Sequence, residues 1–381
     1  MFTKSVDIMR IVLSLSFFLL FLVNSFSQST NDILNLLISN KTISQSQADS
    51  IRAEAALGQQ QADASRKSFF LTAARQMQLT GFTQVRYQEF QESGKHNSFD
   101  IRRARLDLKG SVTPVFSYRL QVDFVDKPKI LDAYSEIKLA DYFTITAGQF
   151  KIPFSMENLA PVNKMEMIDF SQVVEALVAR SKDVIGNQNG RDIGVQVGGT
   201  ILKIKDLPLI EYRLGVFNGS GINVADTANN AKDVAGRLIF NPFKGFSFGG
   251  SIYRGWDKAI KPDVPGHSQT RNRIGGEFSY VTTAFLLRGE YIAGKDGKTN
   301  RAGWYIEAGY FVIPQKVQIL AKYDVYDPNT ATPNNISTNY VFGGNYNFNS
   351  WSRLQAFYTI RQEEGTAVKN NFLSVQYQIG F

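Results

Sequence analysis

Cysteine is absent from the 381-residue sequence, so no disulfide can stabilise the chain. Histidine is nearly absent too, because only His96 and His267 occur, and both lie among polar residues typical of loops. The sequence also has no His-Glu-x-x-His motif and no complete Gly-x4-Gly-Lys-Ser/Thr loop. These absences argue against an enzyme, and they give no reason to expect a metal or a cofactor.

Long apolar runs are scarce. Ile11–Val23 is the one clear example, and at about 13 residues it is too short to cross a bilayer core of roughly 30 Å. The chain is therefore not a bundle of transmembrane helices. Because Lys4 and Arg10 precede this run and Ser25-Phe26-Ser27 comes after it, residues 1–27 are predicted to be a signal peptide cleaved before Gln28. A membrane anchor is the alternative.

Residues 28–77 differ from the rest of the mature chain in the spacing of their apolar residues. Apolar residues at 33–38 and 51–57 predict two short helices, the second preceded by serine and threonine caps. We predict a periplasmic helical or coiled extension, with a flexible linker as the alternative.

From residue 78 to the C-terminus, apolar and polar residues alternate with period two, which indicates strands with one wet and one dry face. The run from Val115 to Val125 shows this most clearly. Such segments reach about 10–13 residues, longer than the usual 5–6 of soluble sheets and suited to strands tilted across a membrane. Backbone groups in lipid must all be paired, so the sheet is expected to close.

The sequence thus predicts an all-β fold, an antiparallel transmembrane β-barrel of about 16 strands covering residues 78–381. The expected strands are 78–90, 99–113, 115–126, 129–139, 142–150, 191–204, 209–218, 232–241, 245–255, 270–281, 283–293, 302–313, 315–326, 337–349, 352–363 and 369–381.

One connection, residues 151–190, is exceptionally long for a barrel, and long loops are usually functional. It carries apolar residues at helical spacing from Met165 to Val178. We expect it to fold into the lumen and constrict it. An external loop that contributes to contacts between subunits is the alternative.

Three stretches suggest a family: residues 99–106 (FDIRRARL), 118–124 (YRLQVDF) and 147–157 (AGQFKIPFSME), together with Asn218-Gly219-Ser220-Gly221. They resemble the phosphate-selective porin O and P family over residues 78–381. This resemblance implies a Gram-negative outer-membrane porin, usually a homotrimer, that passes small anions such as phosphate through a lumen carrying Arg and Lys. Outer-membrane lipid and the barrel-assembly machinery would be its other partners, with Phe381 as the terminal assembly signal. A non-conducting structural or adhesive β-protein is the alternative.

The alternation also assigns residues to the lumen. The pore-lining, anion-binding candidates are Arg103, Arg105, Lys109, Arg119, Arg213, Arg237, Arg271, Arg273, Arg288, Lys322, Arg353 and Arg361, with Arg86 beside them. In the long connection the constriction candidates are Lys151, Lys164, Arg180 and Lys182.

Arginine can donate two hydrogen bonds to one oxyanion, which suits an anion path. Many carboxylates share these inward rows, however, so for any single arginine we expect pairing with a carboxylate more often than anion contact. The net charge of +8 is spread along the strands and interleaved with acids, so nucleic acid is not an expected partner.

Overall fold

The computed structural model describes residues 35, 37–40, 42, 44–45, 47–48, 69–72, 75–224, 230–257, 269–366 and 368–381. The chain divides into two compact units, Met1–Lys67 and Ser68–Phe381. In the first unit, residues 37–39 and 47–48 are helical. The predicted signal peptide, and most of the predicted extension, lie outside the described residues. Among the residues described, no helix has the length and apolar character needed to span a membrane.

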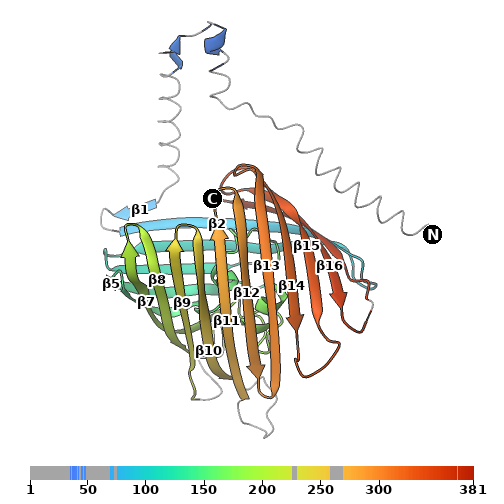
Figure 1. The fold of residues 1–381 in the computed structure, drawn as a ribbon. Coiled ribbons are helices and arrows are strands. Elements are labelled where there is room, and N and C mark those ends of the chain that lie inside the picture. The colour runs from blue at the N-terminus through green and yellow to red at the C-terminus, as the bar shows by residue number, and fades with distance from the viewer. Residues whose placement is uncertain are drawn as a thin grey trace, which may run out of the picture. The chain divides into compact units, whose positions relative to one another are not determined.

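The second unit is an antiparallel sheet that curves into a closed barrel (Figure 1). A short strand, β1 (Phe69–Thr72), pairs with the start of the first barrel strand. The barrel strands are β2 (Arg75–Phe90), β3 (Ser98–Ser111), β4 (Phe116–Asp123), β5 (Lys129–Ala140), β6 (Phe143–Lys151), β7 (Arg191–Ile204), β8 (Leu207–Phe217), β9 (Asp233–Phe243), β10 (Phe246–Asp257), β11 (Gln269–Val281), β12 (Phe285–Asp296), β13 (Thr299–Ile313), β14 (Val317–Asp327), β15 (Ser337–Asn347), β16 (Arg353–Glu363) and β17 (Phe372–Gly380).

The barrel closes because each strand from β2 to β17 is hydrogen-bonded to two neighbours. Each pairs with the strands next to it in sequence, and the last, β17, pairs with β2. The terminal Phe381 extends this seam, where its backbone exchanges two hydrogen bonds with Gly81. Closure satisfies the backbone groups that a lipid environment would otherwise leave without partners.

The predicted all-β fold is confirmed, and the sixteen expected strands occur in the expected order. The barrel unit starts earlier than residue 78, since β2 begins at Arg75 and β1 precedes it. The pairing of β1 with β2 explains this difference, because it extends the sheet into residues that lack clear alternation.

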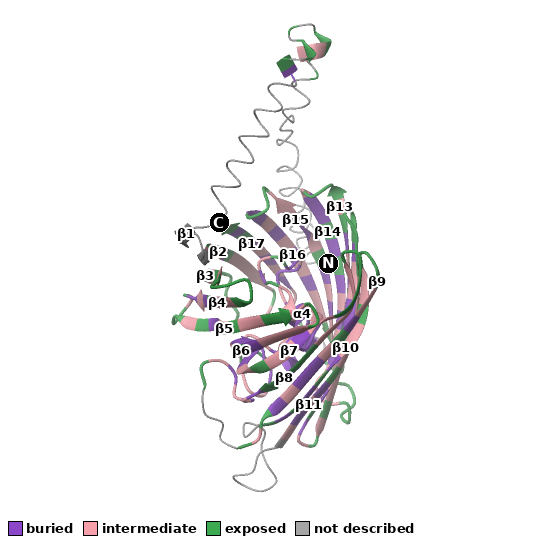
Figure 2. Cartoon of the chain, turned by 90° about the vertical axis from the view of Figure 1, so that its left-hand side faces the viewer, coloured by how far each residue is buried: buried purple, intermediate pink, exposed green. Residues whose placement is uncertain are grey.

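The two faces of the wall are the reverse of those of a soluble protein. Outward apolar side chains are exposed, for example Phe99 at 78% and Ile274 at 60%, whereas the opposite face buries charged side chains such as Glu307. Buried positions alternate with less buried ones along the barrel strands (Figure 2). An apolar exterior around a polar interior is the pattern of a membrane barrel.

The long connection between β6 and β7 contains two short helices, α4 (Met156–Leu159) and α5 (Gln172–Leu177). The apolar spacing from Met165 to Val178 indicates a longer helix, and that expectation is wrong for residues 165–170. Two separate apolar clusters divide the stretch: Met167 and Ile168 pack with strand residues such as Phe357, whereas Val173 and Leu177 pack with others such as Ile292.

The strand residues that contact this connection belong to the inward rows. Leu286, Ile292 and Tyr305 alternate with exposed neighbours such as Tyr291 and Trp304, yet they are themselves buried. The contacts therefore lie on the inner side of the wall, where α5 packs against β12, β13 and β14.

Candidate functional site: a basic cavity inside the barrel

The arginines of β3 are positioned by strand alternation and by one irregularity. Arg103 and Arg105 point inward with the buried Asp107. The pairing of β2 with β3 shifts register between Gln84 and Val85, where Gln84 lies opposite Arg103 and Val85 opposite Ile101. Such a bulge gives β3 one extra residue, Arg102, and aims it inward beside Arg103.

Arg102 is held in place by the long connection. Its guanidinium donates hydrogen bonds to the Ile168 carbonyl oxygen at 2.6 Å and to the Asp169 carboxylate at 2.7 Å. A third, longer bond of 3.3 Å reaches Gln376 on β17. The adjacent residue, Arg103, donates to the Gln84 side chain at 2.8 Å and has no ion pair among the described residues.

These side chains line a cavity of about 450 Å³ between the connection and the wall formed by β2–β5 and β14–β17. Formal charge in its lining is predominantly positive. The basic residues are Arg86, Arg102, Arg103, Arg105, Lys129, Arg180, Lys182, Lys322 and Arg361, and the acidic residues are Asp123, Asp126, Asp169, Glu175 and Asp324.

Burial and neighbouring charges shift the pKa values of Asp169 and Arg180 in the connection. Burial alone would raise the pKa of Asp169, but the nearby guanidinium groups of Arg102 and Arg86 hold it below its usual value. Burial lowers the pKa of Arg180 to about 9, which leaves it protonated at neutral pH. Arg180 lies 3.6 Å from the ring centre of Phe170 and donates to Asn158 at 2.7 Å. The Asp169 carboxylate and the Arg180 guanidinium are therefore both charged at neutral pH.

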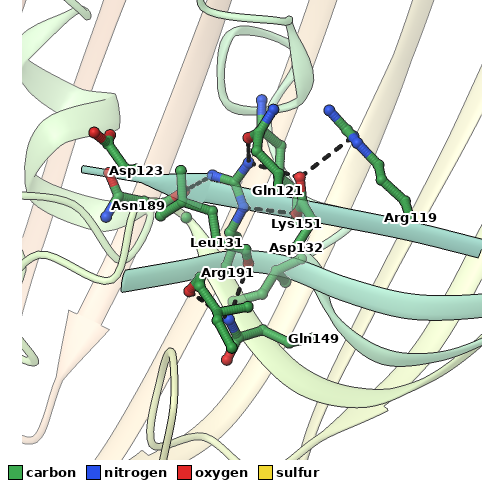
Figure 3. A network of polar contacts seen from close by, with 12 residues as sticks. Arg119, Gln121, Asp123, Leu131, Asp132, Gln149, Lys151, Asn189 and Arg191 are labelled. Carbon is green, nitrogen blue, oxygen red and sulfur yellow. Dashed lines mark hydrogen bonds and ion pairs between the residues drawn. The ribbon is translucent and has the colours of Figure 1, made fainter. Parts of the chain in front are cut away.

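A second polar network fixes the point where the connection rejoins the wall (Figure 3). Arg191, the first residue of β7, forms two hydrogen bonds with Asp132 at 2.7 and 3.0 Å and one with Gln121 at 3.2 Å. Asp132 also lies 3.3 Å from Arg119. At the other end of the connection, Lys151 donates to the Ala160 carbonyl oxygen at 2.6 Å.

Carboxylates of the opposite wall hold the two short helices. Glu290 on β12 accepts hydrogen bonds from the backbone N–H groups of Met156 and Glu157 at 3.0 and 2.6 Å. Asp324 on β14 accepts from the Gln172 backbone N–H at 2.9 Å. These carboxyl oxygens accept hydrogen bonds from N–H donors that a short helix leaves unpaired at its start.

The structure divides the predicted lumen residues into two groups. Seven line the cavity: Arg86, Arg103, Arg105, Arg180, Lys182, Lys322 and Arg361. The others lie outside its lining, and most of these arginines are paired: Arg119 with Asp107, Arg237 with Glu277, Arg271 with Asp183, Arg273 with Asp296, and Arg288 with Glu166 and Glu307.

The remaining candidates are scattered. Lys109 is exposed 3.5 Å from Asp107, and Arg213 and Lys164 are exposed. Arg353 is buried at 3.5 Å from Gln378. The Phe381 side chain is exposed at the end of β17. Arg102 and Arg191 were not predicted, since a bulge and a loop boundary hide them from a period-two pattern.

Within the described part of the chain, no group of three or more histidine, aspartate or glutamate side chains is arranged to hold a metal ion. The inner surface instead offers fixed charge around a passage. A closed sixteen-stranded barrel with an apolar exterior, a charged interior and a long connection against its inner wall has the architecture of a porin.

Comparisons with known proteins give the same class. The profile of the family described as phosphate-selective porin O and P matches residues 76–380. This chain belongs to that family, and it is an outer-membrane porin. No curated protein of similar sequence was found.

Several solved structures share the fold. The anion-selective porin from Comamonas acidovorans is 11% identical with a TM-score of 0.60, and the match covers 81% of this chain and 100% of that one. Salmonella typhi OmpF in complex with daunomycin is 10% identical with a TM-score of 0.60, covering 81% and 98%. The trimer form of in-vitro folded OmpT, an outer-membrane protein of Vibrio cholerae, is 12% identical with a TM-score of 0.57, covering 81% and 100%.

Proposed function

We propose that this porin lets small hydrophilic anions diffuse passively in preference to cations, with phosphate among the anions that pass. The observation that carries the proposal is the cavity lining, in which nine basic side chains face five carboxylates. A passage lined by one sign of charge raises the local concentration of the opposite ion. The connection between β6 and β7 is proposed to be the constriction, since its residues form one side of this cavity.

Arg103 is the residue most suited to contact a passing anion. It lines the cavity, its one hydrogen-bond acceptor is the neutral Gln84 amide, and no carboxylate among the described residues neutralises it. A guanidinium can donate two parallel hydrogen bonds to a phosphate or carboxylate. Arg361 also faces the cavity without an ion pair in the described residues, and it stacks 4.6 Å from the ring centre of Phe372.

Anion preference is a better description of this lining than strict phosphate specificity. Five carboxylates share the cavity, and Arg105 is paired with Asp123 at 2.8 Å. Paired charges contribute less to the field that a passing ion meets. Conduction also requires that each site bind weakly enough for the ion to leave.

A homotrimer is the proposed assembly. The family resemblance motivates it, and the solved trimer form of OmpT shows that this fold is compatible with three-fold assembly in a related architecture. Chemical cross-linking of the detergent-extracted protein should give a ladder ending at the trimer. A ladder that ends at the monomer would contradict this part of the proposal.

The test of the function is the reversal potential of single channels in a planar bilayer under a KCl gradient, with phosphate then added to both sides. We expect anion selectivity in the wild type, reduced in Arg103→Gln and unchanged in Lys244→Gln. Lys244 is a matched control because it is an exposed residue in the turn between β9 and β10, outside the cavity lining.

Added phosphate should reduce the chloride current of the wild type, and less so that of Arg103→Gln. A cation-selective or non-selective wild type would contradict the proposed preference. A wild type that is anion-selective but indifferent to phosphate would leave a chloride-passing porin and remove phosphate from the proposal.

A further inference from the structure

Asp169, a residue of the connection between β6 and β7, places a negative charge in the lining of the basic cavity. Its carboxylate lies 2.7 Å from the Arg102 guanidinium and 3.6 Å from that of Arg86. Its backbone carbonyl accepts a hydrogen bond from Lys322 at 3.0 Å. Three basic side chains of the wall therefore converge on one residue of the connection.

Exposure shows which partner faces the open volume. The Asp169 side chain is 40% exposed, whereas those of Arg102 and Arg86 are 11% and 16% exposed. An ion in the cavity therefore meets the carboxylate before it meets the two guanidinium groups. To reach them, a permeating oxyanion has to compete with Asp169.

The guanidinium groups are also fixed by partners other than Asp169. Arg86 forms two hydrogen bonds with Asp100, at 3.1 and 2.6 Å, and Arg102 is held by the Ile168 carbonyl oxygen. Neutralising Asp169 would therefore leave both arginines in place and oriented. Preorganised donors bind an incoming anion without a further ordering cost.

We infer that Asp169 is an internal counter-anion that weakens the binding of permeating anions at Arg102 and Arg86, and so shortens their stay in the cavity. The inference rests on the proposed anion preference and deepens it, because it names a residue that sets the strength of that preference. An alternative role is purely structural: the ion pair would hold the connection against β3 and have no effect on selectivity.

The deciding comparison is Asp169→Asn against Asp126→Asn. Both variants remove one negative charge from the lining of the same cavity, but Asp126 has no ion pair among the described residues. Asparagine fits both places: at 169 its side-chain oxygen can still accept from Arg102, and at 126 it tolerates the positive φ of 60°. Heat-modified migration on gels would establish that both variants are folded barrels.

We expect Asp169→Asn to shift the reversal potential further toward anions than Asp126→Asn does. The phosphate concentration that halves the chloride current should fall about tenfold in Asp169→Asn and by less than about twofold in Asp126→Asn. Equal shifts in the two variants would overturn the inference, because net charge alone would then explain them. Unchanged selectivity in Asp169→Asn, with altered conductance, would also overturn it and favour the structural role.

The wild-type reversal potential tests the proposed function separately. If the wild type prefers cations, the proposed function fails, whereas the difference between the two variants still decides whether Asp169 competes with passing anions.

Discussion

Replacing Asp183 with asparagine should loosen the connection between β6 and β7 from the barrel wall. Asp183 accepts two hydrogen bonds from Arg271 on β11, at 3.2 and 2.7 Å, and also one from the Ala179 backbone N–H at 2.8 Å. The paired side chains are 0% and 2% exposed, and Arg273 lies 3.8 Å away. The Asp183 carboxylate is therefore the buried counter-charge of two arginines.

The size of the effect depends on the charge that the substitution leaves behind. Burial alone would raise the pKa of Asp183, but Arg271 and Arg273 hold it below its usual value, so the carboxylate is charged at neutral pH. Removing one partner of a buried pair typically costs about 3–5 kcal/mol, because the other charge remains desolvated and unpaired. That corresponds to a factor on the order of 100 or more in the equilibrium between the attached and the detached connection.

Single-channel recording measures the result. A connection that detaches more often should give a higher or noisier open-channel current in Asp183→Asn than in the wild type. Asp141→Asn is the matched control, since Asp141 pairs with Lys138 at 2.7 Å on an exposed turn and its loss should leave the current unchanged. Wild-type current and noise in Asp183→Asn would refute the reasoning that this pair holds the connection in place.

Three further predictions concern other parts of the barrel. Gly190→Ala should make the native conformation at the end of the connection less stable by about 1–3 kcal/mol, because Gly190 has a φ of +67° and an added Cβ would clash with the Asn158 side-chain oxygen. Increased noise in the single-channel current would show this. The reversal-potential difference between wild type and Asp169→Asn should be the same at about pH 7 and about pH 5, and should shrink only below the usual carboxyl pKa of 3.8. The reason is that the pKa of Asp169 is lowered, so its carboxylate stays charged until the pH falls through that lowered value. Deleting Phe381 should lower the amount of heat-modifiable barrel in outer membranes, since it removes two backbone hydrogen bonds with Gly81 at the closing seam as well as the predicted assembly signal.

The strands could be predicted from sequence because each strand separates two uniform environments, lipid on its outer face and a polar interior on its inner face. A residue that faces lipid must be apolar and its neighbour faces a wet interior, so period two holds over whole segments such as β4 and β14. Only the ends were imprecise. β4, for example, spans 116–123 rather than the expected 115–126, because pairing stops before the polarity pattern does.

The site was less predictable, for a geometric reason. Alternation assigns Arg103 and Arg105 to the lumen and therefore assigns Arg102 to lipid, but the bulge opposite Gln84 reverses that assignment. A bulge is defined by pairing with another strand, and in the sequence of β3 its sign is the adjacent pair Arg102-Arg103, which interrupts the alternation. Arg191 was missed because it is the first residue of β7, at a boundary where no alternation has yet been established.

The alternation along the strands also could not show which arginines are free of carboxylate partners and so face passing ions. Arg271 and Arg103 both point inward from their strands, yet Arg271 is paired with Asp183, whereas the acceptor of Arg103 among the described residues is the neutral Gln84 amide. The difference comes from the connection, which delivers a carboxylate to one part of the wall and leaves another part free. Inward basic residues therefore differ in role: some paired ones, such as Arg271 and Arg102, attach the connection, whereas Arg103 and Arg361 line the cavity without an ion pair among the described residues. Selectivity in this barrel should accordingly respond far more to substitutions that change pairing inside the cavity than to those that change net charge elsewhere on the chain.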